Sequence, residues 1–412
     1  MAVMLWGKVY FQDTYVGILK QEANGRYVFA YDASYLSSSL PAIAFSLPLR
    51  EEPFISERGL HPFFDNLVAE GWFQNAQSRA LGVSPNDRFS LLLGFGFDLA
   101  GGISIIDPEP REHRRVDHDA VMIAASQSRA SLSGIQSKLL VVKEGNHYRP
   151  TTGKELSTHI AKFQSRTLED ILELEYLTTL AIRELIPNDE VVNMEMNFVH
   201  LEKEKREALI IKRFDRTDSG KRLHFEEFNQ LLGHESDGKY NGFYEEMGNF
   251  IFEEAGLAEA DKLYRRILAC FMVGNTDAHF KNFAMFHTRD GLRLTPAYDL
   301  VASAKYPEFQ ALALGVAGVK NLDIGELKPK HLIEMANAKN GFRLNENAIN
   351  TAVNEIGKRL PQAQSAISRS EIGAFSLREK LIEMMEKRWK GNFELIGKLL
   401  SKKQSKGERN KS

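Results

Sequence analysis

The hydrophobic pattern changes its period along the chain, and this change constrains the fold more than any other feature. Up to about residue 225, apolar residues form short β-branched and aromatic runs between turn signals, which indicates strands. The expected strands cover residues 3–11, 15–20, 26–31, 103–106, 138–143, 147–149, 159–163, 191–199 and 208–214. Beyond that point they recur at helical spacing. The helices expected there cover residues 260–273, 329–338, 345–359 and 376–400. Earlier helices are expected near residues 61–68 and 87–93. A further one is expected to open with a capping box at residues 167–170 and to end near Ile186.

This order of elements predicts an α+β fold in several domains. At 412 residues the chain is too long for one simple core. Residues 107–115 carry two prolines and alternating charge, which is typical of a linker. The expected parts are an N-terminal β-rich subdomain (1–106), a mixed lobe (119–224), a helical lobe (225–400) and a disordered basic tail (401–412).

Composition excludes several classes of protein. Lys and Arg total 53 against 55 Asp and Glu, for a net charge of -2, so a pervasive nucleic-acid-binding surface is not indicated. Cys270 is the only cysteine, which rules out an intrachain disulfide and fits a reducing compartment. Lys8 comes too early for a secretory signal, and apolar runs are too short to span a membrane. The expected location is cytoplasmic.

Polar residues crowd into residues 274–283, between an apolar helix and a strand-like segment. Asp277 and Asn282 have the D-x-x-x-x-N spacing of a phosphotransfer loop, in which Asp orients the attacking hydroxyl and Asn holds Mg²⁺. Lys281 can offset charge on the moving phosphoryl group. Asp299 follows the next strand and can ligate the metal, and Asn282 with Asp299 is a sufficient protein set for Mg²⁺.

Asp277 and His279 each have an alternative interpretation. Asp277 taken alone is more often a turn or helix-capping residue, and its spacing to Asn282 and Asp299 weakens that alternative. His279 beside Asp277 suggests the Asp-x-His metal pair of a metallohydrolase. Because no second His-rich cluster accompanies it, a structural histidine bonded to backbone is the stronger expectation.

The nucleotide-binding half of such a site is expected in the mixed lobe. Residues 129–138 form a small polar loop whose N–H groups can bind phosphate, although it matches neither the Walker nor the glycine-rich kinase pattern. Lys162 lies in an apolar strand, and Glu175 on the next helix is either its partner or merely exposed. Residues 210–216 end a buried strand in a hinge that can bind adenine through its backbone. The pattern favours an ATP-dependent phosphotransferase.

A glycine-rich segment at residues 94–102 is the other candidate phosphate loop. It lacks the G-x-G-x-x-G spacing, and apolar residues fill its gaps. We interpret it as a turn before a strand at residues 103–106.

In sequence order these motifs resemble the HipA family of serine/threonine kinases, the toxin components of bacterial toxin–antitoxin pairs. The resemblance covers nearly the whole chain. The matching segments are residues 63–67, 70–71, 131–138, 157–162, 211–216, 222–228, 274–283 and 298–300.

The resemblance implies a protein-kinase-like two-lobed fold with an N-terminal β-rich subdomain and an all-helical C-terminal lobe. It implies that Asp277 is the catalytic base, with Lys281 in the catalytic set, and that Asn282 and Asp299 bind Mg²⁺. The implied ATP-binding residues are Ser133, Gly134, Ile135, Gln136, Ser137, Lys138, Lys162, Lys212, Arg213, Phe214, His279, Lys281, Asn282 and Asp299.

Members of the family also autophosphorylate a serine in the phosphate loop, which ejects the loop and disables ATP binding. Ser131 occupies that place, and Ser133 remains the alternative. Two residues depart from the family pattern. Ser137 stands where many relatives have proline, so the loop can be more mobile, and Lys212 replaces an acidic residue of some relatives. The second change is tolerable if the hinge acts through its backbone.

The function implied by the resemblance is a protein kinase whose target is a component of translation, such as an aminoacyl-tRNA synthetase. A DNA-binding antitoxin is the implied partner, with DNA contacted only through that complex. One alternative is a co-repressor partner of the antitoxin whose catalysis is lost or incidental. A weaker one is a small-molecule or lipid kinase, because phosphotransfer residues do not name the acceptor.

Overall fold

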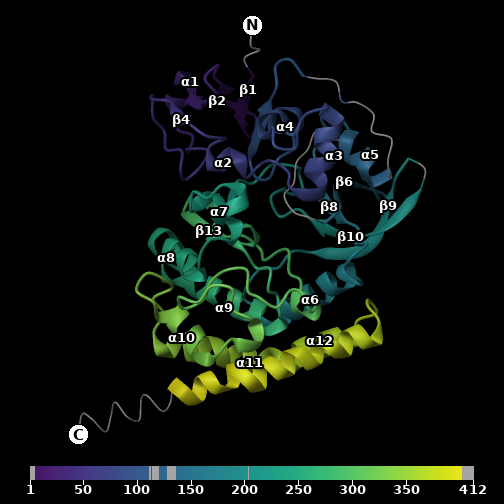
Figure 1. Ribbon diagram of the computed structural model, residues 1–412, viewed down its shortest axis with the longest axis vertical. Coiled ribbons are helices and arrows are strands. Elements are labelled where there is room, and N and C mark those ends of the chain that lie inside the picture. Colours follow the sequence, from purple (N-terminus) through teal and green to yellow (C-terminus); the bar gives the residue numbers. More distant parts are fainter. Residues whose placement is uncertain (1–4, 111–112, 114–119, 128–135, 203, 401–412) are drawn as a thin grey trace. The chain divides into compact units, whose positions relative to one another are not determined.

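The structure is a computed structural model that describes residues 5–110, 113, 120–127, 136–202 and 204–400 (Figure 1). The chain divides into two compact units. We call Met1–Thr167 with Asn193–Gly238 the β unit, and Leu168–Val192 with Lys239–Ser412 the helical unit. The units cut the chain at places other than the expected boundaries, since residues 1–106 share the β unit with most of residues 119–224.

A five-stranded antiparallel sheet opens the β unit. The short apolar runs predict four of its strands, and the short strand Phe54–Ser56 was not anticipated. The order of the sheet is β4 (Phe54–Ser56), β3 (Tyr27–Tyr31), β2 (Thr14–Gln21), β1 (Trp6–Phe11) and β5 (Ile103–Ile106). The strand expected at residues 103–106 is confirmed. Phenylalanines from the sheet and the helices beside it, among them Phe29, Phe64 and Phe95, form a buried core.

Four helices connect these strands: α1 (Ala33–Leu36), α2 (Pro62–Asp65), α3 (Gly71–Leu81) and α4 (Arg88–Phe95). The helix expected near residues 61–68 is only the one turn of α2, and α3 was not anticipated. The helix expected near residue 87 is confirmed as α4, which begins where the Asp87 carboxylate accepts the Ser90 N–H at 3.1 Å. Gly94 lies in this helix rather than in a turn.

Five further strands of the β unit close into a small barrel. Its order is β10 (Lys205–Lys212), β8 (His159–Lys162), β6 (Lys138–Glu144), β7 (His147–Pro150) and β9 (Met194–His200). Every one of these strands was expected. Leu139 and Val141 pack in one cluster with Phe73 of α3 and Val121 of α5 (Ala120–Gln127). The N-terminal subdomain and the barrel therefore share a core. The short β11 (Phe225–Glu227) and α7 (Phe228–Leu231) complete the unit.

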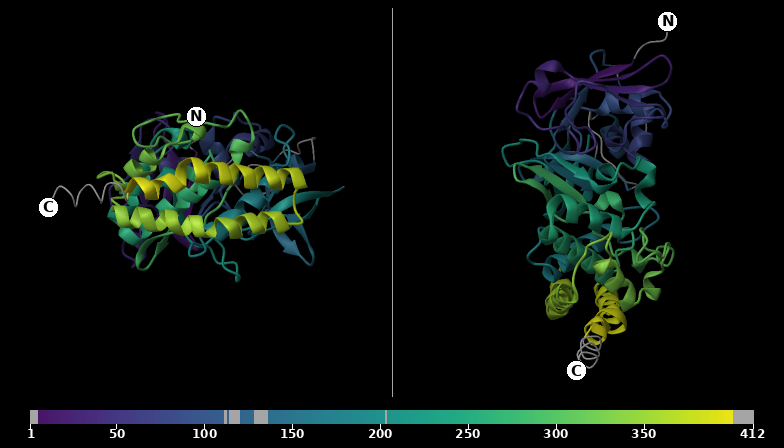
Figure 2. Two further views of the ribbon diagram at one scale, coloured as in Figure 1. Left: turned by 90° about the horizontal axis from the view of Figure 1, so that it is seen from below. Right: turned by 90° about the vertical axis from the view of Figure 1, so that its left-hand side faces the viewer.

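The helical unit is built from the helices that the sequence predicts, with one addition. They are α6 (Ile171–Leu185), the unexpected α8 (Tyr244–Ala255), α9 (Leu257–Val273), α10 (Pro329–Asn337), α11 (Glu346–Arg369) and α12 (Phe375–Arg388). α6 packs on α9 and α11, and α11 lies beside α12 (Figure 2). α11 continues through Pro361 because Ala363 and Ile367 beyond it are buried. Among the described residues, no helix is both long and apolar enough to cross a bilayer.

Two expectations for this unit are wrong. α6 begins at Ile171, and Asp170 before it has a left-handed backbone (φ +56) and makes no capping hydrogen bond in the described structure. Its carboxylate instead accepts from Lys305 Nζ at 2.9 Å, while Tyr306 donates to the Glu169 carbonyl. Tertiary contacts thus replace the capping box. The C-terminal part is not all-helical either, because β12 (Ala284–Thr288) and β13 (Gly291–Leu294) form a hairpin.

Candidate active site

The loop that carries Asp277 begins at the end of α9, where Gly274 is required for two reasons. Gly274 has φ +88, a left-handed conformation that favours glycine, and its N–H donates to the Cys270 carbonyl at 3.0 Å. Asn275 N–H donates to the same carbonyl at 2.8 Å. A Cβ on Gly274 would lie 2.6 Å from Arg388 Nη2. The start of the loop is therefore fixed by backbone conformation and by close packing.

Asp277 is accessible and hydrogen-bonded. The Tyr240 hydroxyl donates to Asp277 Oδ1 at 3.0 Å, and the Tyr240 ring meets the His279 ring edge-on. The Asp277 side chain keeps an exposed surface. The surrounding protein nevertheless displaces water from the carboxyl group, and this desolvation raises its pKa to about 6. The negative charge of Asp299 adds to this rise in pKa, while Tyr240 and Lys239 oppose it. A carboxyl group with this pKa is a proton acceptor at neutral pH.

His279 has a structural role, as expected. Its backbone N–H donates to Asn282 Oδ1 at 3.0 Å, and its Nδ1 accepts the Lys281 N–H at 3.3 Å. These bonds cap the short 3₁₀ helix Phe280–Asn282. In the described part of the chain, Asp277 and His279 belong to no cluster of three His, Cys, Asp or Glu ligand atoms.

Asn282 and Asp299 meet, although the β12–β13 hairpin separates them in sequence. Asn282 Nδ2 donates to Asp299 Oδ2 at 2.9 Å. Asp299 has φ +55, which is uncommon for a residue other than glycine, and Tyr298 before it donates to the carbonyl of the buried Lys281 at 2.8 Å. An amide and a carboxylate offer the hard oxygen ligands that Mg²⁺ prefers, so these residues fit that ion. The negative charge of Asp299 also acts on Asp277 and raises its pKa.

Two lysines of the β unit lie opposite each other on neighbouring strands. Lys138 of β6 pairs with Lys162 of β8, and both are buried. Their neighbours Leu139 and Ala161 belong to the core shared with α3, so the lysines lie on the other side of the ladder. Two ammonium groups on one side suit a ligand with several negative charges.

The start of β6 is tied to the end of β8. Gln136 Nε2 donates to the Phe163 carbonyl at 2.9 Å, and Phe163 N–H donates to the Ser137 carbonyl at 3.0 Å. The rest of the expected phosphate loop lies outside the described residues, namely Ser131, Ser133, Gly134 and Ile135. The expected Lys162–Glu175 pair would join the two units and stays a prediction.

Two backbone N–H groups of the expected hinge donate hydrogen bonds within the β unit. Lys212 N–H donates to the Asn193 carbonyl at 2.9 Å, and Arg213 N–H donates to the Thr158 carbonyl at 3.0 Å. These two N–H groups are therefore already engaged within the β unit.

The side chains of the hinge point to different environments. Lys212 is exposed and pairs with Asp218 in a surface turn, with 2.6 Å between Nζ and Oδ1. Arg213 is buried and pairs with Asp98 and Asp215. Asp98 comes from the glycine-rich segment that we interpreted as a plain turn.

Sequence reasoning missed Tyr240 and Asp98. No spacing rule connects Tyr240 with Asp277, since they lie 37 residues apart and meet only through the fold. The signal for Asp98 was a carboxylate inside a run of apolar residues, because such a charge must be paired when it is buried.

Two family models match most of the chain. The family model described as HipA-like C-terminal domain matches residues 130–364, and the HipA N-terminal domain model matches residues 7–106.

Individual relatives span most of the chain. A Sinorhizobium fredii protein described as a candidate kinase, Y4dM, is 29% identical over 71% of this chain and 76% of its own length. The serine/threonine-protein kinase toxin HipA of Shewanella oneidensis is 28% identical over 73% of this chain and 75% of its own. A solved complex of Shewanella oneidensis HipA, HipB and operator DNA contains a chain with TM-score 0.72 and 22% identity. That match covers 95% of this chain and 99% of the other.

Proposed function

This chain belongs to the HipA family, and on that premise we propose that it is an ATP-dependent serine/threonine protein kinase with a kinase-like two-lobed layout. The observation that carries the proposal is the Asn282–Asp299 contact at 2.9 Å, with Asp277 beside it. Phosphoryl transfer requires positioning and electrostatic stabilisation, and little covalent chemistry from the protein. These three side chains can supply both.

Each residue has a distinct task in the proposed reaction. Asp277 orients a serine or threonine hydroxyl and accepts its proton as the oxygen bonds to the γ-phosphorus, while the bond to the bridging oxygen breaks and ADP leaves. Tyr240 holds Oδ1 of Asp277, which leaves Oδ2 for the acceptor. Asn282 and Asp299 hold Mg²⁺, which when bound neutralises charge on the phosphate oxygens. Lys281 offsets charge on the moving phosphoryl group.

The lysines of the β unit supply the proposed phosphate contacts of that unit. Lys138 and Lys162 are opposite each other on neighbouring strands and can bind the phosphates. The family resemblance implies that the loop of residues 131–138 would cover the phosphates. The hinge at residues 212–214 takes adenine. Autophosphorylation of Ser131, or of Ser133, would silence the kinase by driving this loop outward, because the added charge repels the phosphates of ATP.

The proposed target is a component of translation, such as an aminoacyl-tRNA synthetase, and the proposed restraint is a DNA-binding antitoxin. The second of these is supported by the solved relative, which is in complex with HipB and operator DNA. That observation also favours a second candidate function, in which the chain serves mainly as co-repressor and phosphotransfer is minor.

One experiment separates the two functions. The purified chain is incubated with labelled ATP, Mg²⁺ and cell lysate, in parallel with Asp277→Asn, and labelled proteins are identified by mass spectrometry. A kinase labels a discrete acceptor only with the native chain. Absence of labelling by both, together with equal support of antitoxin–operator binding by both in a gel-shift assay, would favour the co-repressor.

A further inference from the structure

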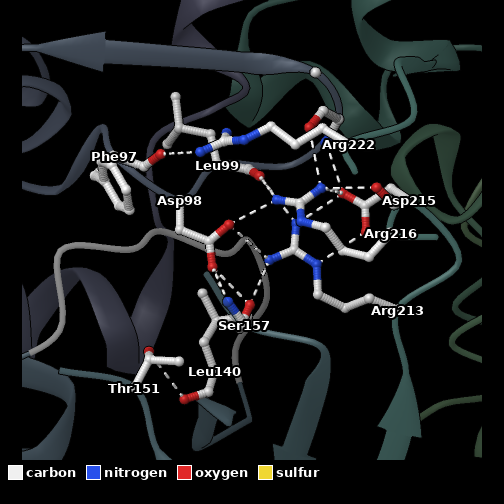
Figure 3. A network of polar contacts seen from close by, with 12 residues as sticks. Phe97, Asp98, Leu99, Leu140, Thr151, Ser157, Arg213, Asp215, Arg216 and Arg222 are labelled. Carbon is white, nitrogen blue, oxygen red and sulfur yellow. Dashed lines mark hydrogen bonds and ion pairs between the residues drawn. The ribbon is translucent and has the colours of Figure 1, made fainter. Parts of the chain in front are cut away.

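Asp98 lies at the centre of a buried ionic cluster in the β unit (Figure 3). The Asp98 cluster consists of Asp98, Ser157, Arg213, Asp215 and Arg216. Its members come from three segments: the turn between α4 and β5, the residue before Thr158 and β8, and the hinge after β10. All five are buried.

Both carboxylate oxygens of Asp98 accept hydrogen bonds. Oδ1 accepts from Arg216 Nη2 at 2.6 Å and from Arg213 Nη1 at 3.3 Å. Oδ2 accepts from the Ser157 N–H at 2.9 Å and from its hydroxyl at 2.6 Å. Arg213 Nη1 also donates to Ser157 Oγ at 2.8 Å. A single side chain of the N-terminal subdomain thus holds the hinge and the start of β8 together.

The charges of the cluster depend on each other. Burial alone would raise the pKa of Asp98, but the guanidinium groups of Arg213 and Arg216 outweigh it and hold that pKa below its ordinary value. Asp215 pairs with the same two arginines, and its pKa is lowered to about 2. Arginine cannot release its proton to relieve a missing partner. Removing the Asp98 charge would therefore leave buried positive charge uncompensated, and the guanidinium groups would have to move.

We propose that Asp98 is a positioning residue for the nucleotide: it fixes the hinge against the strand that carries Lys162. The proposal rests on the proposed kinase function. Ser157 directly precedes Thr158, whose carbonyl accepts the Arg213 N–H at 3.0 Å. A nucleotide has a fixed span from base to phosphates, so the hinge and Lys162 must keep a fixed separation. A displacement of about 1 Å at such a site can cost up to about a hundredfold.

The expected signature is a loss of nucleotide affinity without a loss of turnover. Asp98 is in the β unit, whereas Asp277, Asn282 and Asp299 are in the helical unit. Asp98→Asn should raise the KM for ATP about tenfold, and kcat at saturating ATP should stay within about threefold of the native value. A purely structural role would instead lower the active fraction, which reduces apparent kcat and leaves KM unchanged.

Asp65→Asn is the matched control. Asp65 is also a buried carboxylate of the β unit; it pairs with Arg88 and accepts the Ser236 N–H at 2.8 Å. This variant should lower the melting temperature and leave the KM for ATP unchanged. Ser157→Ala is the milder test if Asp98→Asn fails to fold. It removes two hydroxyl contacts and keeps the ion pairs, so a rise in KM of several-fold is expected.

Nucleotide titration of all four proteins, followed by steady-state kinetics, decides the matter. Increased KM in Asp98→Asn or Ser157→Ala, but not in Asp65→Asn, supports the role of Asp98. Native affinity in both Asp98→Asn and Ser157→Ala, or an equal loss in Asp65→Asn, overturns that role and leaves the kinase proposal standing. Failure of the native chain to bind ATP overturns the kinase proposal and this inference together.

Discussion

Asp277 is the residue whose substitution separates chemistry from binding. Asp277→Asn keeps the size and the hydrogen bond with Tyr240 but removes the proton acceptor. Phosphotransfer should fall about a thousandfold or more, because orientation of the acceptor supplies much of this catalysis. The fold and ATP affinity should remain, as measured by circular dichroism and calorimetric titration. Activity within about tenfold of the native chain would remove Asp277 from the base role.

Asp299→Ala should behave differently from Asp277→Asn. It removes a proposed metal ligand and the acceptor of the Asn282 amide. Binding of ATP should weaken when Mg²⁺ is present and change little when Mg²⁺ is chelated, because the lost contact runs through the ion. Titration with and without EDTA measures both. Equal affinity of the native chain and Asp299→Ala in Mg²⁺ would contradict the ligand assignment.

The raised pKa of Asp277 predicts a pH dependence. As a base it works only when ionised, so kcat/KM should fall as the pH drops through about 6. Tyr240→Phe removes a hydrogen bond that favours the ionised form, so the acidic limb should move to higher pH. The variant should lose more activity at pH 6.5 than at pH 8. A loss that is uniform with pH would mean that Tyr240 only supports the fold.

At the scale of elements, the cap of α2 predicts an acid-dependent stability. His61 Nδ1 accepts the Phe63 N–H at 3.3 Å, and burial lowers the pKa of His61 from 6.5 to about 4. Between these two values the unfolded chain binds a proton that the folded chain does not, so stability should fall as the pH drops from 6.5 towards 4. His61→Asn keeps a capping acceptor and cannot titrate. Urea unfolding at pH 7 and 5 should show a smaller difference for the variant than for the native chain.

Elements were predictable where local pattern decides them. Alternating and helical periods located the barrel strands, β5 and α9. The five-residue spacing singled out Asp277 and Asn282, whose roles stay predictions. Local pattern failed where distant contacts decide. Lys305 and Tyr306 replace the expected cap of α6, and burial of Ala363 carries α11 through Pro361. Tyr240 reaches Asp277 only through the fold.

At the scale of the whole molecule, the N-terminal subdomain should be required for a soluble β unit. Residues 119–400 expressed alone lack α3, whose Phe73 packs in the same cluster as Leu139 and Val141, and they also lack Asp98. Apolar surface would be uncovered and buried arginines left unpaired. We expect low solubility and binding of a hydrophobic dye relative to the full chain. A well-behaved monomer in ultracentrifugation would contradict this expectation.

The chain path also has a consequence for synthesis on the ribosome. The chain leaves the β unit after residue 167 and then forms α6. The apolar face of α6 is covered by α9 and by α11, which begins at Glu346. At translation rates of about 5–20 residues per second, α11 emerges on the order of ten seconds after α6. During that interval a nascent amphipathic helix stays uncovered, and pairing over so long a stretch is slow. Cotranslational chaperones should therefore engage this segment, and rare codons between α6 and α11 would lengthen the vulnerable period.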